Sequence, residues 1–375
     1  MSSSTTLANP TDITFKMDEE SGIWAINILL VLIIIYTIWY IIRYATIKSW
    51  DCSTMNSLYD TNKSIQSVSS VSPASNMALR DCYVKTAYNC CSGGSYKNGY
   101  VDLCNLKAVI RSGARCLDFE VYSIGDQPVV STSALQNICS KETFNSIPFA
   151  SVMEVLSHTA FGSLKECPNP QDPLIIHLRV KSDNVQMFNN FAKTLEKYDN
   201  ILLGKRYSFE SHGKNLGETT ISELSGKIAI IIDRTNSAFL ESKTFTEYVN
   251  LTSNSIFMRA LHYNDIKYAP DITELTRFNR AQMTIGMPDR GSNPDNPSGM
   301  LLRETGCQFL GMGYQITGAY LDEMHAFFDQ AGYAFVIKPR NLRYHRKTIP
   351  MPEKQNENLS YATRNVNGGF YQFKI

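Results

Sequence analysis

Residues 111–122 read RSGARCLDFEVY, which combines the apolar pattern of a buried strand with two acidic side chains. Side chains alternate between the two faces of a strand, so Cys116, Asp118 and Glu120 share one face. Two carboxylates on one face of an interior strand repel each other and lose hydration unless a cation lies between them. We therefore expect a buried basic side chain beside Asp118 and Glu120.

The chain around this stretch alternates strand-like and helix-like segments from Met77 to about His345. Between strand-like runs, apolar residues recur at helical spacing along 149–156 and 185–195. This alternation predicts a parallel α/β domain, and its length suits a TIM (β/α)8 barrel, here a distorted one. A doubly wound sheet is the alternative, but no glycine-rich phosphate loop follows the first strand. The apolar runs of strand length include 174–180, 227–232, 307–312 and 333–338.

One segment before this domain is long enough to cross a membrane. Residues 23–42 (IWAINILLVLIIIYTIWYII) contain no charged side chain, and a helix of that length spans the hydrocarbon core of a bilayer. A buried core helix is the alternative, whereas a cleaved signal peptide would have a basic leading flank and a small-residue cleavage site. Acidic residues precede the segment, while Arg43 and Lys48 follow it. The positive-inside rule therefore predicts a single-pass membrane protein with its barrel on the cytoplasmic side.

The composition of the other segments predicts the domain organisation. Residues 1–22 form a short polar tail, and residues 43–76, rich in Ser and Thr, have the composition of a flexible tether. The barrel is expected over 77–346 and a polar tail over 347–375. A net charge of +1 gives no reason to expect nucleic-acid binding. Nine cysteines, without a C-x-x-C pair, predict mostly reduced thiols and a cytosolic-type environment.

Several segments of the predicted barrel resemble the catalytic domain of phosphoinositide-specific phospholipase C. Residues 112–122, followed by Gln-Pro-Val-Val at 127–130, look like the second strand of its X half. The resemblance places an X-like half at about 80–236 and a Y-like half at about 265–343. It implies a distorted TIM barrel of the PLC-like phosphodiesterase type, with its site at the carboxyl ends of the strands. The other matching segments, in family order, are 173–179, 223–230, 277–282, 305–318 and 332–343.

The resemblance also implies which residues occupy the family's catalytic positions. In the family, two histidines perform acid–base phosphoryl transfer, and here those positions correspond to Tyr88 and Thr132. A phenol with a pKa near 10 and an aliphatic hydroxyl are poor substitutes for imidazole at neutral pH. The resemblance therefore implies a barrel that is degenerate at its catalytic positions. The family's positions for two phosphate-binding lysines and a substrate-contacting Arg and Tyr hold Ile231, Asp233, Ile285 and Met287.

By the same resemblance, the expected cation beside the two carboxylates is Arg179. The family binds calcium through an Asn and three carboxylates; Asn89, Asp118 and Glu120 match three of these ligands, and Arg179 replaces the fourth. A guanidinium can pair with both carboxylates and would enter the space of the metal. We expect no cofactor, and calcium only if the three remnant ligands still bind it. We expect Asn89, Asp118, Glu120 and Arg179 to form a substrate-binding cluster.

His177 precedes Arg179 by two residues and should face the same barrel interior. It is therefore a candidate replacement base. The alternative, which we favour, is a core histidine hydrogen-bonded one layer below the site, because interior barrel layers are packing positions. The remaining histidines are expected to face solvent: His158, His212, His262, His325 and His345.

These observations favour a membrane-anchored, catalytically inactive barrel that binds a lipid head group, a phosphoinositide or other phosphate ester, or a protein partner at the bilayer. The alternative is an active, divergent phosphoric diester hydrolase that uses Arg179 in place of calcium, as related bacterial phospholipases do, with His177 or Tyr88 transferring protons. A third hypothesis is a structural protein of a membrane, including a viral one. The enzyme requires an open cleft with His177 at its floor, whereas a scaffold would fill that cleft.

Overall fold

The computed structural model describes residues 19–60, 64–135, 140–209, 215–346, 348–354 and 361–375. The chain divides into two compact units, one up to Arg343 and one from Tyr344 to Ile375. The boundary lies close to the predicted start of the C-terminal tail. The larger unit contains the barrel.

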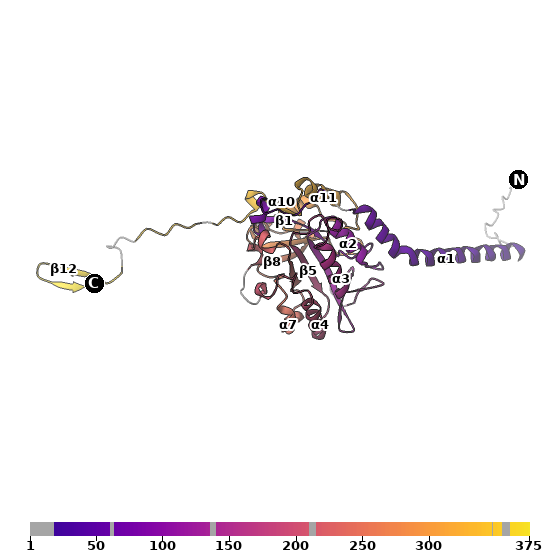
Figure 1. Cartoon of the computed structure of the whole chain (residues 1–375), viewed down its shortest axis with the longest axis horizontal. Helices are drawn as coiled ribbons and strands as arrows, with labels where there is room; N and C mark the ends of the chain where they lie inside the picture. The colour runs from indigo at the N-terminus through magenta and orange to yellow at the C-terminus, as the bar shows by residue number, and fades with distance from the viewer. Residues whose placement is uncertain (1–18, 61–63, 136–139, 210–214, 347, 355–360) are drawn as a thin grey trace, which may run out of the picture. The chain divides into compact units, whose positions relative to one another are not determined.

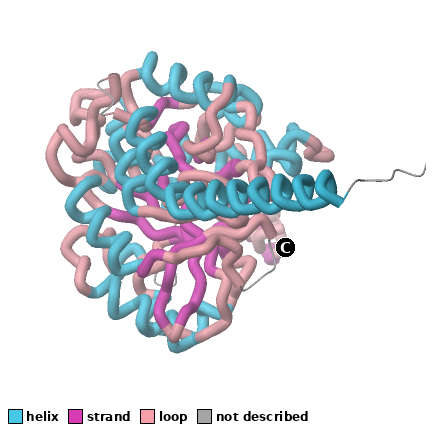
Figure 2. The backbone as a smooth tube through the Cα atoms, turned by 90° about the vertical axis from the view of Figure 1, so that its right-hand side faces the viewer, coloured by secondary structure: helices cyan, strands magenta, loops and turns pink. Residues whose placement is uncertain are grey.

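Among the described residues, eight parallel strands form a nearly closed barrel with helices on its outside (Figures 1 and 2). They follow one another around the ring in the order β7, β6, β5, β2, β1, β10, β9 and β8. The described residues of β7 and β8 do not pair, and this seam is the one interruption of the ring among the described residues. The predicted distorted TIM barrel is confirmed. The strands are β1 (Cys82–Ala87), β2 (Cys116–Ile124), β5 (Leu174–Val180), β6 (Ile228–Asp233), β7 (Leu251–Ser253), β8 (Met258–His262), β9 (Met283–Met287) and β10 (Phe309–Met312).

Antiparallel strands extend the sheet outside the ring. Strand β11 (Phe335–Ile337) pairs with β1, while β3 (Gln127–Ser131) pairs with β2 and with β4 (Ile147–Pro148). In the parallel register, Asp118 of β2 lies opposite His177 of β5, and Glu120 lies opposite Arg179. This register places the acidic pair beside the predicted cation.

Several of the covering helices begin at a side-chain cap and bury one apolar face. The Asn184 side chain, for example, caps α4 by accepting from the backbone N–H groups of Gln186 and Met187, and Phe188 and Phe191 are buried. The α-helices of the barrel are α2 (Leu103–Arg111), α3 (Phe149–Val155), α4 (Val185–Glu196), α6 (Ile221–Leu224), α7 (Lys243–Thr246), α8 (Tyr263–Lys267), α9 (Ile272–Ala281), α10 (Gly299–Glu304) and α11 (Ala319–Ala331). Short 3₁₀ helices are Pro73–Asn76, Leu79–Asp81, Lys205–Tyr207, Leu216–Glu218, Ala238–Glu241 and Arg340–Leu342, and a π-helical turn spans Leu156–Ala160.

Helix α1 (Glu19–Leu58) contains the apolar segment and continues without a break to the barrel surface beside α2 (Figure 1). By length and composition it is one helix that could cross a membrane, and the apolar part is exposed throughout. The prediction of a flexible tether over 43–76 is wrong. Met55 and Tyr59 are buried in the core, and Val68 N–H donates to Asp172 at 2.7 Å. These single apolar residues bury against the barrel, and such tertiary contacts leave no periodic signal in the sequence.

A disulfide joins Cys52 of α1 to Cys104 of α2, with the two Cα atoms 5.9 Å apart. The prediction of mostly reduced thiols therefore holds for six described cysteines, all of them buried, but not for this pair. The two positions are distant in sequence and meet only because α1 packs on α2. Cys139 lies outside the described residues.

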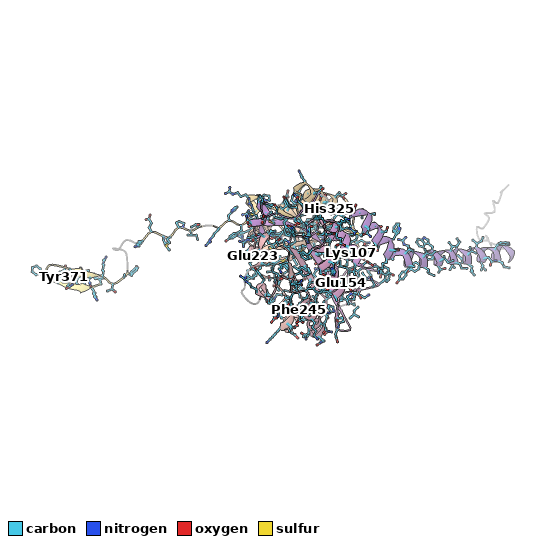
Figure 3. All side chains as sticks on the ribbon, viewed as in Figure 1. Lys107, Glu154, Glu223, Phe245, His325 and Tyr371 are labelled. Atoms are coloured by element: carbon cyan, nitrogen blue, oxygen red, sulfur yellow. A yellow bond between two sulfur atoms is a disulfide. The ribbon has the colours of Figure 1, made fainter. Side chains whose placement is uncertain are left out.

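The C-terminal unit differs from a featureless polar tail, because it contains a hairpin of β12 (Asn365–Asn367) and β13 (Gln372–Lys374). Tyr371, labelled in Figure 3, and Phe373 pack with their rings tilted by 32° and the centroids 5.6 Å apart, and both remain exposed.

Candidate functional site

A cleft with a cavity volume of about 80 Å³ opens at the carboxyl ends of the barrel strands. Glu120, Arg179 and Asp233 reach it from β2, β5 and β6, and His262 and Met287 reach it from β8 and β9. The cleft is therefore where a TIM barrel carries its site. Ala260 of β8, Asp265 of α8 and loop residues complete the lining; the loop residues are Tyr88, Tyr96, Ser133, Ala134, Leu135, Lys181, Thr235, Asn254, Asp289, Arg290 and Gly291.

Arg179 lies between the acidic side chains. Its Nε donates to Asp118 Oδ1 at 3.0 Å, and its Nη2 donates to Asp118 Oδ2 at 2.8 Å and to Asn89 Oδ1 at 2.7 Å. Its Nη1 lies 3.7 Å from Glu120 Oε1, and Lys181 Nζ lies 3.8 Å from the same oxygen. The expectation that Arg179 is the cation beside both carboxylates is confirmed by these contacts.

The pKa values of Asp118 and Glu120 are shifted in opposite directions by this environment. Burial by itself would raise the pKa of Asp118, but the Arg179 charge and the His177 hydrogen bond hold it well below its usual value. Burial raises the pKa of Glu120 above its usual value, because the more distant Arg179 and Lys181 charges only partly offset the lost hydration. Asp118 is thus firmly ionised, whereas Glu120 is the carboxylate that protonates first as the pH falls.

The family's calcium ion does not fit this arrangement. Asn89 Oδ1 and Asp118 Oδ2 both accept from the guanidinium of Arg179, so the oxygens that would hold the metal are directed at a fixed positive charge. Calcium needs six to eight oxygen ligands, and the guanidinium occupies their centre. Within the described part of the chain, no group of three or more His, Cys, Asp or Glu side chains is placed to hold a metal.

The two residues that the resemblance places at the family's histidine positions lie in different environments. Tyr88 lines the cleft, and its ring stacks on Arg179, whose Cζ is 4.5 Å from the ring centroid. Burial raises the pKa of Tyr88 to about 12 although Arg179 opposes the shift, so the phenol keeps its proton. Thr132 is buried and donates its hydroxyl to the Tyr96 carbonyl at 3.0 Å. The neighbouring Ser133, rather than Thr132, reaches the cleft.

His177 is a core residue. Its Nδ1 lies 2.7 Å from Asp118 Oδ1, and its Nε2 lies 3.0 Å from Ser253 Oγ. The order Ser253–His177–Asp118 is that of a nucleophile, its base and an orienting carboxylate. All three side chains are fully buried and none of them lines the cleft, so the arrangement positions Asp118 instead of reaching a substrate.

The imidazole in the cleft is His262, which we expected to face solvent. It stands at the end of β8, where its Nδ1 donates to the Pro288 carbonyl at 2.6 Å and its Nε2 accepts from Arg290 Nε at 3.4 Å. Burial lowers the pKa of His262, which favours this neutral form. The strand ending at His262 was not among the strands predicted from sequence.

The other histidines divide between surface and core. His158 and His345 are exposed as expected, and His212 lies outside the described residues. The expectation for His325, which is labelled in Figure 3, is wrong. Its ring packs against Tyr59 and Tyr314, with centroids 5.6 and 5.3 Å away. Burial lowers the pKa of His325 to about 3.

Formal charges in the cleft nearly cancel. Three cations line it, Arg179, Lys181 and Arg290, against four carboxylates, Glu120, Asp233, Asp265 and Asp289. The net charge of the lining is thus −1 when His262 is neutral. The two positions that the resemblance matches to phosphate-binding lysines hold Ile231, which is buried, and Asp233, which brings a negative charge. This lining does not concentrate multiply charged anions.

Comparison with solved structures gives the same fold. PLC21 of L. pealei matches with a TM-score of 0.57 at 16% identity, over 72% of this chain and 38% of that chain. PLC21 of S. officinalis matches with a TM-score of 0.57 at 15% identity, over 76% and 40%. A calcium-dependent phosphoinositol-specific phospholipase C of Pseudomonas sp has a TM-score of 0.45 at 11% identity, over 70% and 96%. No protein-family model and no curated protein sequence matches the chain.

The two PLC21 structures show that this chain has a PLC-like phosphodiesterase barrel, as the sequence resemblance implies. The chain spans about two fifths of their length. At this level of identity the likeness establishes the fold alone.

Proposed function

We propose that this protein is a membrane-anchored, PLC-like barrel that does not cleave phosphodiesters and instead binds a lipid head group in the cleft. The observation that carries the proposal is the position of Arg179, which donates to Asp118 and Asn89 and pairs with Glu120. In this position the guanidinium pairs with the side-chain oxygens that match the family's metal ligands. Anchoring is supported by the apolar, exposed part of α1.

Loss of catalysis is supported by the proton-transfer groups. Attack by a neighbouring hydroxyl needs one group that accepts a proton and another that protonates the leaving oxygen. At the family's two positions, Tyr88 keeps its proton and Thr132 is buried away from the cleft. His177 is fully buried below the cleft and is not accessible to a substrate.

The charge of the cleft supports a head group without several phosphates. A lining with cations and carboxylates side by side suits a zwitterionic head group.

The test uses the full chain reconstituted in lipid nanodiscs. Phosphatidylinositol and its phosphates are supplied with calcium or with chelator, and the release of inositol phosphates is measured against nanodiscs without the protein. We expect no release above this control in either condition. Release by the unmodified chain, with or without calcium, would overturn the proposal.

Binding is measured on the same preparation by the melting temperature with soluble head-group analogues. Glycerophosphocholine should raise the melting temperature more than inositol trisphosphate does, and Arg290→Gln should reduce that shift. Equal or larger shifts with inositol trisphosphate would contradict the ligand class. No shift with any analogue would contradict head-group binding itself.

A second function is favoured by one observation, the neutral imidazole of His262 in the cleft. A divergent phosphodiesterase could use Arg179 as its built-in cation and His262 as its single base. In that case calcium-independent release of inositol phosphates would occur and would be lost in His262→Ala but retained in Tyr88→Phe.

A further inference from the structure

The disulfide between Cys52 and Cys104 lies on the barrel side of the apolar segment 23–42. Cys52 belongs to α1 and Cys104 to the first turn of α2, and their Cα atoms are 5.9 Å apart. That separation is within the usual range for bonded cysteines. The bond joins the helix that leaves the membrane to the body of the barrel.

Independent contacts hold the two helices in this register. Lys48 Nζ pairs with Asp102 Oδ2 at 2.8 Å, and Asp102 also caps α2 by accepting from the Cys104 N–H at 2.8 Å. The Tyr44 ring lies 5.0 Å from the Phe144 ring. On the other side of Cys52, Arg111 of α2 donates to Asn56 of α1, so the packing brings Cys52 to Cys104 independently of the bond.

Glycine at position 93 permits this approach. A Cβ added to Gly93 would lie 2.8 Å from the Asp51 Cβ and 2.6 Å from the Asn105 Nδ2, closer than real side chains come. The neighbour of Cys52 thus rests directly on the barrel backbone. This part of the surface is shaped to receive α1.

A persistent disulfide indicates the redox state of the compartment in which the barrel lies. Cytosolic thiols are kept reduced by the glutathione and thioredoxin pools, whereas disulfides persist in oxidising compartments. The positive charges of Arg43 and Lys48 favour the opposite orientation, with the barrel in the cytoplasm. Lys48, however, forms an ion pair with Asp102. One basic residue and one ion-paired lysine are a weak topology signal.

We infer that the barrel lies on the oxidising side of its membrane, with the N-terminus in the cytoplasm, the reverse of the orientation predicted from the flanking charges. The inference rests on the anchoring proposed above but not on any ligand in the cleft. The bond forms by exchange with the disulfide of an oxidising protein. One cysteine thiolate attacks that disulfide, the second displaces the donor, and two electrons and two protons leave with the donor as its dithiol.

The first test counts bonded cysteines in the full chain from intact cells. Free thiols are blocked with N-ethylmaleimide in denaturant, disulfides are then reduced, and the new thiols are labelled with a polyethylene-glycol maleimide. We expect Cys52 and Cys104 to be labelled only after reduction. Cys52→Ser or Cys104→Ser should each remove both labels, and Cys82→Ser, which changes a buried free thiol, should remove neither. Absence of both labels after reduction, which means that Cys52 and Cys104 were blocked as free thiols, overturns the inference.

The second test reads the orientation of the unmodified chain in sealed microsomes whose outer face is cytoplasmic. Added protease should remove an N-terminal epitope tag and leave the barrel intact until detergent opens the vesicles. Digestion of the barrel in sealed vesicles overturns the inference even if the bond is present. Release of the chain by carbonate contradicts the anchoring instead, so the two failures are distinguishable.

Discussion

At the scale of single residues, Arg179 explains why Asp118 and Glu120 can share one face of an interior strand. Resemblance to the family identified this arginine, and elementary electrostatics required a cation. His262 and Arg290 could not be predicted, because each reaches the cleft from a strand end or loop that lies far from the acidic strand in sequence. Lys181 follows Arg179 by two residues, and alternation along the strand indicates it shares that face.

Arg179→Ala should destabilise the barrel at neutral pH, because it leaves two buried carboxylates without their main cation. Removing one partner from a buried ion pair costs about 3–5 kcal/mol, and the nearby Lys181 should keep the loss toward the lower value. Urea unfolding of the variant and the parent at pH 7 measures this loss in the free energy of unfolding. At lower pH the variant should regain part of the loss, since a protonated carboxyl no longer repels its neighbour. A variant as stable as the parent at pH 7 contradicts this role.

Glu120 should make the protein less stable as the pH rises. Its pKa is raised in the folded state, so its favourable contribution is complete below the unfolded pKa of about 4.3 and is lost as the pH rises through the folded pKa. Glu120→Gln should remove this loss and flatten the stability profile above the unfolded pKa of about 4.3. Measuring the free energy of unfolding of both proteins across that pH range tests this prediction. If its slope against pH is the same in the variant as in the parent, the prediction is wrong.

At the scale of elements, several barrel strands were readable from apolar runs, and β5 spans Leu174–Val180 as predicted. Strand β8, which ends at His262, was not among them. The docking of α1 was not readable. Its barrel-contacting half is polar overall, and only isolated residues such as Met55 are buried. The Cys-Cys-Ser-Gly-Gly stretch at 90–94 likewise has a packing role that no sequence pattern indicates, because Gly93 faces a helix distant in sequence.

Gly93→Ala should weaken the junction of α1 with the barrel. The added methyl would meet Asp51 and Asn105 at distances below normal contact, and overpacking of this kind costs about 1–3 kcal/mol. Gly369→Ala is the matched control, since nothing lies within 4 Å of its added Cβ. Denaturant unfolding of both variants in detergent should show a loss for Gly93→Ala alone. Equal stability of the two variants would mean that α1 does not rest on this loop.

At the scale of the whole molecule, anchor and barrel share one continuous helix. The full chain should stay with membranes after a carbonate wash, and a chain beginning at Arg43 should be released. A chain beginning at Met77, the start expected from the sequence, should be less stable than the Arg43 chain, because it lacks the buried Met55, Tyr59 and Ile65. Sedimentation and melting temperature test these outcomes. Full-chain release by carbonate contradicts the anchor, and equal melting of the two shortened chains contradicts the packing.

The most direct measurement of the central claim, that Arg179 stands where the family holds calcium, is the melting temperature of Arg179→Glu with chelator and with calcium. In chelator a third carboxylate joins Asp118 and Glu120, so the variant should melt well below the parent. Calcium should raise its melting temperature, because Asn89, Asp118, Glu120 and the new glutamate rebuild the family's ligand set. The parent should not respond to calcium. An Arg179→Glu chain that melts like the parent in chelator and ignores calcium would contradict the account.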